Sequence, residues 1–225
     1  MTQVNIPVVR NILEANERLA AANRQRFEEA GILAVNLMSS PGAGKTSLLE
    51  RTIEHLMGKL RIAVIEGDIQ SSYDAERIQK KGVQAVQINT DGACHLDGNM
   101  VQQAMAPLNL NALDLLVIEN VGNLVCPAEF NLGEHHKVMI LSVAEGDDKP
   151  LKYPLMFQMS SVLLINKIDL LPYVDCSVRT IRERALQLNP HQQIFEISCR
   201  TGEGLDAWCE WLQTKLSELR KNLGR

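Results

Sequence analysis

The spacing of the hydrophobic residues changes once along the chain, near Gly31. Residues 8–29 contain no glycine or proline, and their apolar side chains recur at intervals that line one face of a helix. The residues of this stripe are Val8, Val9, Ile12, Leu13, Leu19, Ala20 and Phe27, and one polar residue, Asn16, interrupts it. The pattern predicts an amphipathic N-terminal helix.

After Gly31 the apolar residues gather in short runs that are separated by turns. The runs are ILAVNLM, RIAVIEG, VQAVQIN, DLLVIEN, KVMILSV, SVLLINK and QIFEISC. Short apolar runs of this kind are typical of buried parallel strands. Segments with helical spacing lie between most of them, at residues 46–57, 74–82, 98–108, 177–188 and 204–223. The alternation predicts an α/β fold, with a doubly wound, mainly parallel sheet of about seven strands flanked by helices.

Length and composition limit the domain count and the classes of partner. A chain of 225 residues is long enough for one large domain, so we expect residues 1–30 to form a helix packed on or extending from the core and residues 31–225 to form one domain. The net charge of -4 argues against broad binding to nucleic acid or anionic lipid. No apolar run reaches the roughly 18 residues that span a bilayer, and the N-terminus lacks a secretory pattern, so we expect a cytoplasmic protein.

Five cysteines are scattered along the chain, at positions 94, 126, 176, 199 and 209. An odd, widely spaced set suits reduced thiols better than a disulfide framework, so cysteine chemistry here is expected to involve metal or redox.

A candidate phosphate-binding loop, SSPGAGKTS, follows the first predicted strand, where ligands of such sheets bind. Its glycines let backbone N–H groups approach phosphate oxygens, and the start of the next helix favours negative charge. Lys45 is expected to reach the outer phosphates and the Thr46 hydroxyl to ligate Mg²⁺. The usual first glycine of this motif is Ser39 here, and the alternative is a glycine-rich turn. The predicted nucleotide-binding residues are Gly42, Ala43, Gly44, Lys45, Thr46 and Ser47.

The sixth predicted strand runs into NKID, which has the form of a guanine-specificity motif with Asn166, Lys167 and Asp169. The Asp169 carboxylate can accept hydrogen bonds from the N1–H and 2-amino groups of guanine, and Lys167 can lie along the base. The alternative is a strand cap followed by a turn. The seventh strand ends at Ser198 and Cys199, where GTP-binding proteins carry a loop whose backbone contacts the guanine carbonyl. Together these segments favour GTP over ATP.

Two acidic residues at strand ends are candidate Mg²⁺ ligands. Glu119 ends the fourth strand, at the position that usually holds Mg²⁺ or its water shell, and Gly122 follows where it can sense the γ-phosphate. Asp68 ends the second strand, where a first switch can touch Mg²⁺ or orient water. For Asp68 the alternative is a carboxylate that caps the next helix.

A candidate metal site involves Cys94, His95 and Cys126, which follow the third and fourth strands and so leave the same edge of the sheet. Two thiolates and an imidazole suit Zn²⁺ or Ni²⁺ and leave one coordination position open. Because Cys126 follows Gly122, it is expected to move with the γ-phosphate. The alternative is that these side chains are ordinary packing residues. The pair His135 and His136 either adds ligands or is solvated at the start of a strand.

Taken together, these segments resemble the HypB family of nickel-incorporation GTPases, which act in hydrogenase maturation. The resemblance covers residues 32–205 and rests on the segments SSPGAGKTSLLE, EGDIQSSYDAERI, VQINTDGACHLDGNMV, VIENVGNLVCPAEFNLGE, LSVAEGDDKPLKYPLMF and NKIDLLPY. It implies a GTPase of the SIMIBI class that dimerises with GTP and helps insert nickel into the large-subunit precursor of [NiFe] hydrogenase, together with the nickel-binding protein HypA. It also implies that Cys94, His95 and Cys126 bind Ni²⁺ or Zn²⁺ at the dimer interface.

The sequence departs from some members of this family in two ways. It has no Cys-rich or His-rich N-terminal tract, so the site in the GTPase domain is expected to be the only metal site. Ser40 stands where relatives place a catalytic lysine, so hydrolysis is promoted otherwise or stays slow. The alternatives are a urease accessory GTPase, which carries Cys-Pro-His instead of adjacent Cys94 and His95, and a metal-independent regulatory GTPase. An ATP-using enzyme is disfavoured by NKID.

Overall fold

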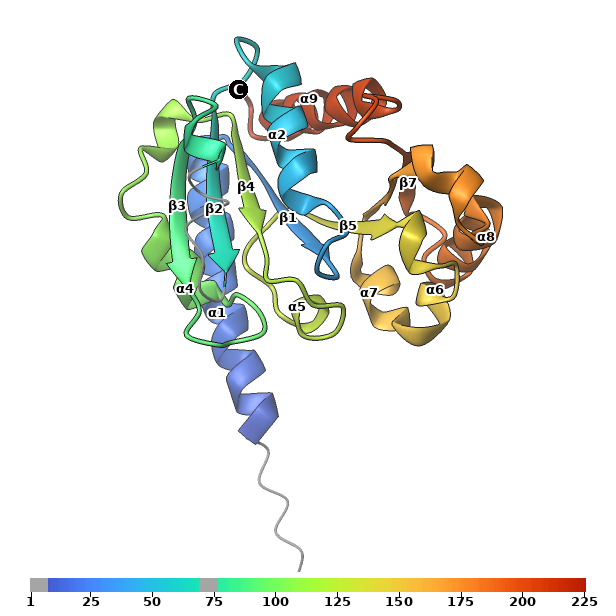
Figure 1. The fold of residues 1–225 in the computed structure, drawn as a ribbon. Helices are drawn as coiled ribbons and strands as arrows, with labels where there is room; N and C mark the ends of the chain where they lie inside the picture. The colour runs from blue at the N-terminus through green and yellow to red at the C-terminus, as the bar shows by residue number, and fades with distance from the viewer. Residues whose placement is uncertain (1–7, 69–76) are drawn as a thin grey trace, which may run out of the picture.

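Seven strands form one parallel sheet in the order β3-β2-β4-β1-β5-β6-β7 in the computed structural model, which describes residues 8–68 and 77–225 (Figure 1). The strands are β1 (Leu33–Ser39), β2 (Ile62–Asp68), β3 (Gln84–Asn89), β4 (Leu115–Glu119), β5 (His136–Ser142), β6 (Val162–Asn166) and β7 (Gln193–Glu196). Each strand coincides with one of the seven apolar runs. The predicted fold class, a doubly wound parallel sheet, is therefore confirmed.

Helices follow most strands. They are α1 (Val8–Ala30), α2 (Lys45–Leu56), α4 (Gly98–Ala104), α5 (Cys126–Glu129), α6 (Lys149–Lys152), α7 (Pro154–Met159), α8 (Val178–Leu188) and α9 (Leu205–Asn222), with 3-10 turns η1 (Leu110–Ala112), η2 (Val143–Glu145) and η3 (Ile168–Tyr173). Of the helix predicted at 74–82, residues 74–76 lie outside the described residues and 77–79 are helical. The hydrophobic pattern did not predict α5, α6 or α7, because each is too short to show a period and has a proline in its first turn.

Helices cover both faces of the sheet (Figure 1). On one face α2 and α9 enclose a core that contains Leu48, Leu212 and Trp208. The indole N–H of Trp208 donates to Thr52 Oγ1 at 3.0 Å, which joins the two helices. On the other face α1 and α4 cover one end of the sheet, and α7 and α8 cover the other end. The carboxyl edge of the strands stays uncovered by these helices, which leaves it for a site.

The polar interruption in α1 has a structural role. Asn16 Oδ1 accepts from the Gly98 N–H at 2.7 Å, and Asn16 Nδ2 donates to the Asn131 carbonyl at 2.8 Å. Asn23 is fully buried and donates to the carbonyls of Gly98 and Leu132. Two asparagines of α1 therefore hold the loops that follow β3 and α5. The division into a helix at 1–30 and a domain at 31–225 stays a prediction.

Among the described residues, no helix combines the length and apolar character that a membrane span requires.

Candidate functional site

The loop between β1 and α2 has the backbone of a phosphate cradle. Gly44 adopts φ 106°, and a Cβ placed there would lie 2.5 Å from Asn166 Nδ2, so the position requires glycine. Lys45 Nζ donates to Ser39 Oγ at 3.1 Å, so the serine that replaces the usual glycine contacts the loop's lysine. Ser40, at the position of the relatives' lysine, donates its hydroxyl proton to Glu145 instead.

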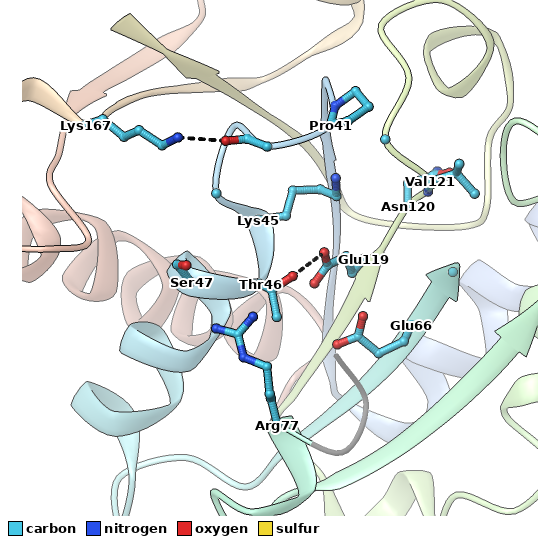
Figure 2. A pocket seen from close by; sticks show the side chains of 14 residues that line it. Pro41, Lys45, Thr46, Ser47, Glu66, Arg77, Glu119, Asn120, Val121 and Lys167 are labelled. Carbon is cyan, nitrogen blue, oxygen red and sulfur yellow. Dashed lines mark hydrogen bonds between the residues drawn. The ribbon is translucent and has the colours of Figure 1, made fainter. Parts of the chain in front are cut away.

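A cavity of about 500 Å³ opens beside this loop (Figure 2). Its lining includes the predicted residues Gly42, Gly44, Lys45, Thr46, Ser47, Glu119, Gly122 and Lys167. Glu119 is 5% exposed, and its Oε1 accepts a hydrogen bond from Thr46 Oγ1 at 3.0 Å. The two predicted Mg²⁺ ligands with described side chains therefore touch. Asp68 is the last residue of β2, and its side chain lies outside the described part of the structure.

Two charged residues that the sequence reasoning missed also line this cavity. Glu66 is 3% exposed and points into the cavity from β2 (Figure 2). Strand alternation was the available signal, because residues two apart on a strand share a face and Glu66 lies two residues before Asp68. Arg77 reaches the cavity and is held by Glu50 of α2, with Nη2 and Oε2 2.6 Å apart. No sequence motif marks Arg77.

Four of the five predicted base-binding residues line a second hollow of about 300 Å³, namely Asn166, Lys167, Asp169 and Cys199. This hollow shares Gly44, Ser47 and Lys167 with the first. Asn166 Nδ2 donates to the Ala43 carbonyl at 2.9 Å, and its Oδ1 accepts from the Cys199 N–H at 3.3 Å. Asn166 therefore ties the phosphate loop to the loop after β7.

The charged residues of NKID are also held in place. Ser198 Oγ donates to Asp169 Oδ1 at 2.6 Å, and Lys167 Nζ donates to the Gly42 carbonyl at 2.7 Å. Lys167 adopts φ 63°, a left-handed conformation that is uncommon for a residue other than glycine. Such conformations gather at ligand sites.

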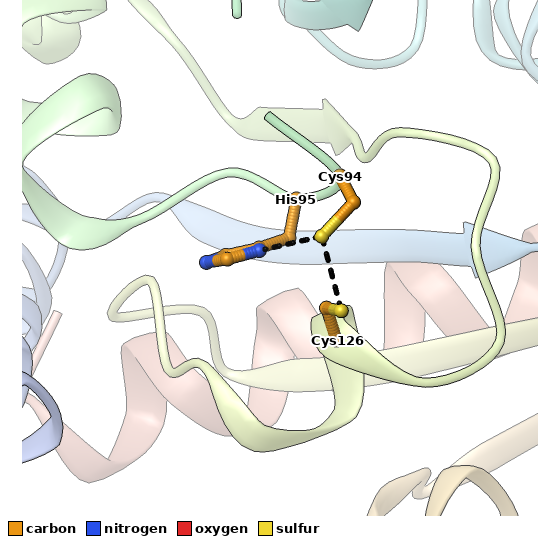
Figure 3. Close-up of side chains that lie close together, drawn as sticks. All are labelled: Cys94, His95 and Cys126. Atoms are coloured by element: carbon orange, nitrogen blue, oxygen red, sulfur yellow. Dashed lines mark hydrogen bonds between the residues drawn. The ribbon is translucent and has the colours of Figure 1, made fainter. Parts of the chain in front are cut away.

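The three predicted metal ligands converge (Figure 3). One ligand atom from each of Cys94, His95 and Cys126 lies within 4.8 Å of the others. Cys94 Sγ is 3.0 Å from Cys126 Sγ and 3.4 Å from His95 Nδ1. Phe130 supports the imidazole, with ring centroids 3.9 Å apart. The described residues contain no other such cluster of three.

The protonation of these ligands follows from their surroundings. Burial lowers the pKa of His95, so its ring is neutral at pH 7 and has a lone pair for a metal. The hydrogen bond with Cys94, followed by burial, raises the pKa of the Cys126 thiol. Cys126 is therefore a thiol at neutral pH without metal, and metal binding must release its proton.

The remaining candidates lie elsewhere. His135 Nδ1 accepts from the Ala34 N–H at 3.0 Å, and His136 packs against Trp211 with ring centroids 4.8 Å apart. The prediction of a solvated pair is wrong, because both side chains are partly buried, His135 beside Phe27 of α1 and His136 against α9. Burial lowers their pKa values to about 3 for His135 and about 4 for His136. Cys209 is fully buried in α9 and lies outside both the nucleotide cavity and the metal cluster.

The nucleotide cavity and the metal cluster are linked through one loop. Asn120, Val121 and Gly122 line the cavity, and Cys126 follows four residues after Gly122. A Cβ on Gly122 would lie 3.1 Å from Pro41, so this loop lies directly against the phosphate cradle.

Comparison with known proteins places these motifs in a family. Residues 33–196 match the model of the CobW/HypB/UreG nucleotide-binding domain. The chain is 52% identical to hydrogenase maturation factor HypB of Rhizobium leguminosarum bv. viciae, over 92% of this chain and 70% of that protein. It is 39% identical to the hydrogenase/urease maturation factor HypB of Helicobacter pylori, over 97% of this chain and 91% of that protein. A crystal structure of Helicobacter pylori HypB in complex with nickel superimposes with a TM-score of 0.87 at 40% identity, covering 91% of this chain and 96% of that chain.

Proposed function

Because the chain belongs to the CobW/HypB/UreG family and, within it, to the HypB hydrogenase maturation factors, we propose that it is a Mg²⁺-dependent GTPase that assists nickel insertion into [NiFe] hydrogenase. The observation that carries this proposal is the convergence of Cys94, His95 and Cys126 beside the loop that lines the nucleotide cavity. GTP and GDP are the nucleotide ligands, and nickel is the cargo, with Zn²⁺ as the alternative ion.

The nucleotide would occupy both hollows. The N–H groups of residues 42–47 and the Lys45 ammonium would bind the phosphates, and Asn166, Lys167, Asp169, Ser198 and Cys199 would surround the base. Ser198 already orients the Asp169 carboxylate, which suits the N1–H and 2-amino donors of guanine. Adenine lacks this pair of donors, so the arrangement favours GTP.

Thr46, Glu119 and Asp68 would hold Mg²⁺. The ion would neutralise negative charge on the phosphates while the γ-phosphoryl group is transferred to water. The hydrogen bond between Thr46 and Glu119 must open when both oxygens turn to a cation. Glu119 would then shift at the end of β4, three residues before Gly122. The loop from Glu119 to Cys126 would carry this shift to the metal ligands, which is how nucleotide state would alter metal affinity.

The donor set fits a thiophilic divalent ion. A metal with bonds of about 2.3 Å holds two sulfurs roughly 3.2 Å apart at a right angle and roughly 3.8 Å apart at the tetrahedral angle. The two sulfurs of Cys94 and Cys126 lie 3.0 Å apart as a hydrogen-bonded thiol pair, so a small widening would let both bind one ion. Three ligands leave a position open for water, for another protein or for a second subunit.

The proposed cycle includes a homodimer in the GTP-bound state, in which the metal sites face each other, and the monomer as the state after hydrolysis. The proposed partners are the nickel-binding accessory protein HypA and the hydrogenase large-subunit precursor, in the cytoplasm. Ser40 binds Glu145 where some relatives place a lysine, so slow turnover is part of the proposal.

A second candidate function is nickel delivery for the maturation of urease, since the Helicobacter pylori relative is described as a hydrogenase/urease maturation factor. Both candidates use the same nickel site, so they differ in the recipient enzyme. Hydrogenase and urease activities measured in a strain that lacks this protein would separate them.

Metal stoichiometry tests the proposal. Purified protein is expected to bind one Ni²⁺ or Zn²⁺ per chain, and Cys94→Ala or Cys126→Ala is expected to lose it. Cys176→Ala is the matched control, because this thiol lies outside the cluster and binding should persist. Stoichiometric metal retained in both cluster variants would refute the metal site and favour a metal-independent GTPase.

A further inference from the structure

A chain of buried polar side chains begins at the nucleotide cavity, next to Glu119. Asn120 lines the cavity, and its Oδ1 accepts from the Leu96 N–H at 3.0 Å, which fixes the backbone immediately after His95. Asn120 Nδ2 donates to Asn36 Oδ1 at 3.2 Å, and Asn36 Nδ2 donates to Glu134 Oε1 at 3.2 Å. Asn36 and Asn120 are fully buried and Glu134 is 4% exposed. These bonds lie in a low-dielectric interior, where each one constrains its partners strongly.

Lys137 stands at the far end of this chain, on β5. Its ammonium lies 4.0 Å from Glu134 Oε1 and donates to the carbonyls of Ala128 at 2.8 Å and Phe130 at 3.0 Å. A third carbonyl, that of Pro127, lies at 3.5 Å. The Lys137 side chain is 10% exposed, so water contributes little to its solvation. The three carbonyls and the Glu134 carboxylate replace that water.

The carbonyls that Lys137 binds belong to the segment that carries one metal ligand and supports another. Cys126 is the first residue of α5, and Pro127 and Ala128 follow it in the same helical turn. Phe130 comes next, and its ring packs on the imidazole of His95. A positive charge also stabilises the carbonyl end of a helix. Lys137 therefore acts on Cys126 through α5 and on His95 through Phe130.

We propose that Lys137, connected through Glu134 and Asn36 to Asn120, is a positioning residue that sets the relative geometry of His95 and Cys126 for metal binding. This inference rests on the proposed metal site. A merely structural ammonium would stabilise the fold by satisfying carbonyls, and any well-packed replacement that folds would leave the metal site unchanged. A positioning residue controls instead the angle and distance at which the ligands meet.

The test compares wild-type protein with Lys137→Met, which keeps an unbranched side chain one atom shorter and removes the charge and the donors. Removing a group that orients metal ligands commonly costs 10–100-fold in metal affinity. We expect Lys137→Met to bind Ni²⁺ about 10–100-fold more weakly in competition with a chelating dye. We also expect its thiolate-to-nickel charge-transfer absorption to differ in position or intensity. Lys137→Arg, which restores a cation with several donors, should recover the wild-type absorption in part.

Two controls keep the result interpretable. Lys221→Met removes an exposed lysine at the end of α9 and should leave nickel affinity and absorption unchanged. GDP affinity should stay within about twofold of wild type in Lys137→Met, since a positioning residue of the metal site leaves the base and phosphate contacts intact. If Lys137→Met does not fold, Lys137→Gln takes its place, because its amide NH2 keeps two donors for the carbonyls without the charge.

A folded Lys137→Met or Lys137→Gln variant with wild-type nickel affinity and wild-type absorption would overturn the inference. The proposed function fails differently: wild-type protein would then show no stoichiometric nickel binding, or Cys94→Ala would bind nickel as wild type does.

Discussion

The buried pair His135 and His136 predicts that the protein loses stability between pH 7 and pH 5. Burial lowers the pKa of His135 to about 3 and that of His136 to about 4, against 6.5 for an ordinary histidine. Protonation of His135 would also place a hydrogen on Nδ1, which accepts from the Ala34 N–H. The folded state therefore disfavours the protonated rings, whereas the unfolded chain takes up protons below pH 6.5.

The sign and size follow from linkage between proton binding and unfolding. Because the unfolded chain binds more protons, the free energy of unfolding falls as the pH drops through 6.5, and it keeps falling toward pH 4. For each histidine the free energy of unfolding falls by about 1.4 kcal/mol per pH unit. Over the roughly 1.5 units from pH 6.5 to pH 5 the loss is about 2 kcal/mol per histidine. Partial exposure of both rings reduces the total for the pair from about 4 kcal/mol to about 2–3 kcal/mol. Typical domains have only about 5–15 kcal/mol of stability, so the loss is measurable.

Urea denaturation at pH 7 and pH 5, with chelator and without nucleotide, measures this difference. Fluorescence of Trp208 and Trp211 reports unfolding, since both lie against the sheet. The double variant His135→Asn with His136→Asn removes the titrating rings, while Asn Oδ1 can still accept from Ala34. We expect the double variant to lose most of the pH dependence, and His191→Asn, at an exposed histidine, to keep it. Equal pH dependence in wild type and the double variant would refute the reasoning.

Three further predictions concern the nucleotide. Lys45→Ala should weaken GTP-analogue binding by at least about 10–100-fold, because a charge-assisted contact to the phosphates is lost, and tight binding measured by calorimetry would count against the cradle. Asp169→Asn should weaken GTP binding and improve binding of xanthosine triphosphate, and unchanged selectivity in a competition assay would mean that the base site is misplaced. Light scattering should show a dimer with GTP analogue and Mg²⁺ and a smaller mass with GDP; one mass in both states would contradict nucleotide-dependent dimerisation.

Local patterns predicted the strands and motifs better than they predicted the contacts between distant segments. Every apolar run became a strand. The central strands β1, β4 and β6 are buried along their whole length, which leaves a continuous apolar signal, and the partly exposed edge strands β3 and β7 still carry short apolar runs. The helices α6 and α7 were missed because both are short and have a proline in the first turn. Pro150 is the second residue of α6, and Pro154 is the first residue of α7. Glu66 was missed although alternation with Asp68 marked it, and Arg77 belongs to no motif.

The metal cluster shows the same limit. The sequence places Cys94 and His95 after β3 and Cys126 after β4, but β2 separates these strands in the sheet. Their approach to within hydrogen-bonding distance depends on how the two loops fold over the edge. That folding depends on Asn16, Asn120 and Lys137, whose side chains bind the backbones of the loops. Such contacts join residues far apart in the chain, and no local pattern shows them.

In the proposed cycle, nucleotide state controls metal binding at Cys94, His95 and Cys126. The most direct measurement is nickel affinity by competition with a chelating dye, once with GDP and once with a GTP analogue, each with Mg²⁺. We expect different affinities in the two states for the wild type, and no high-affinity binding in either state for Cys126→Ala. Equal affinities in the two nucleotide states of the wild type would contradict it.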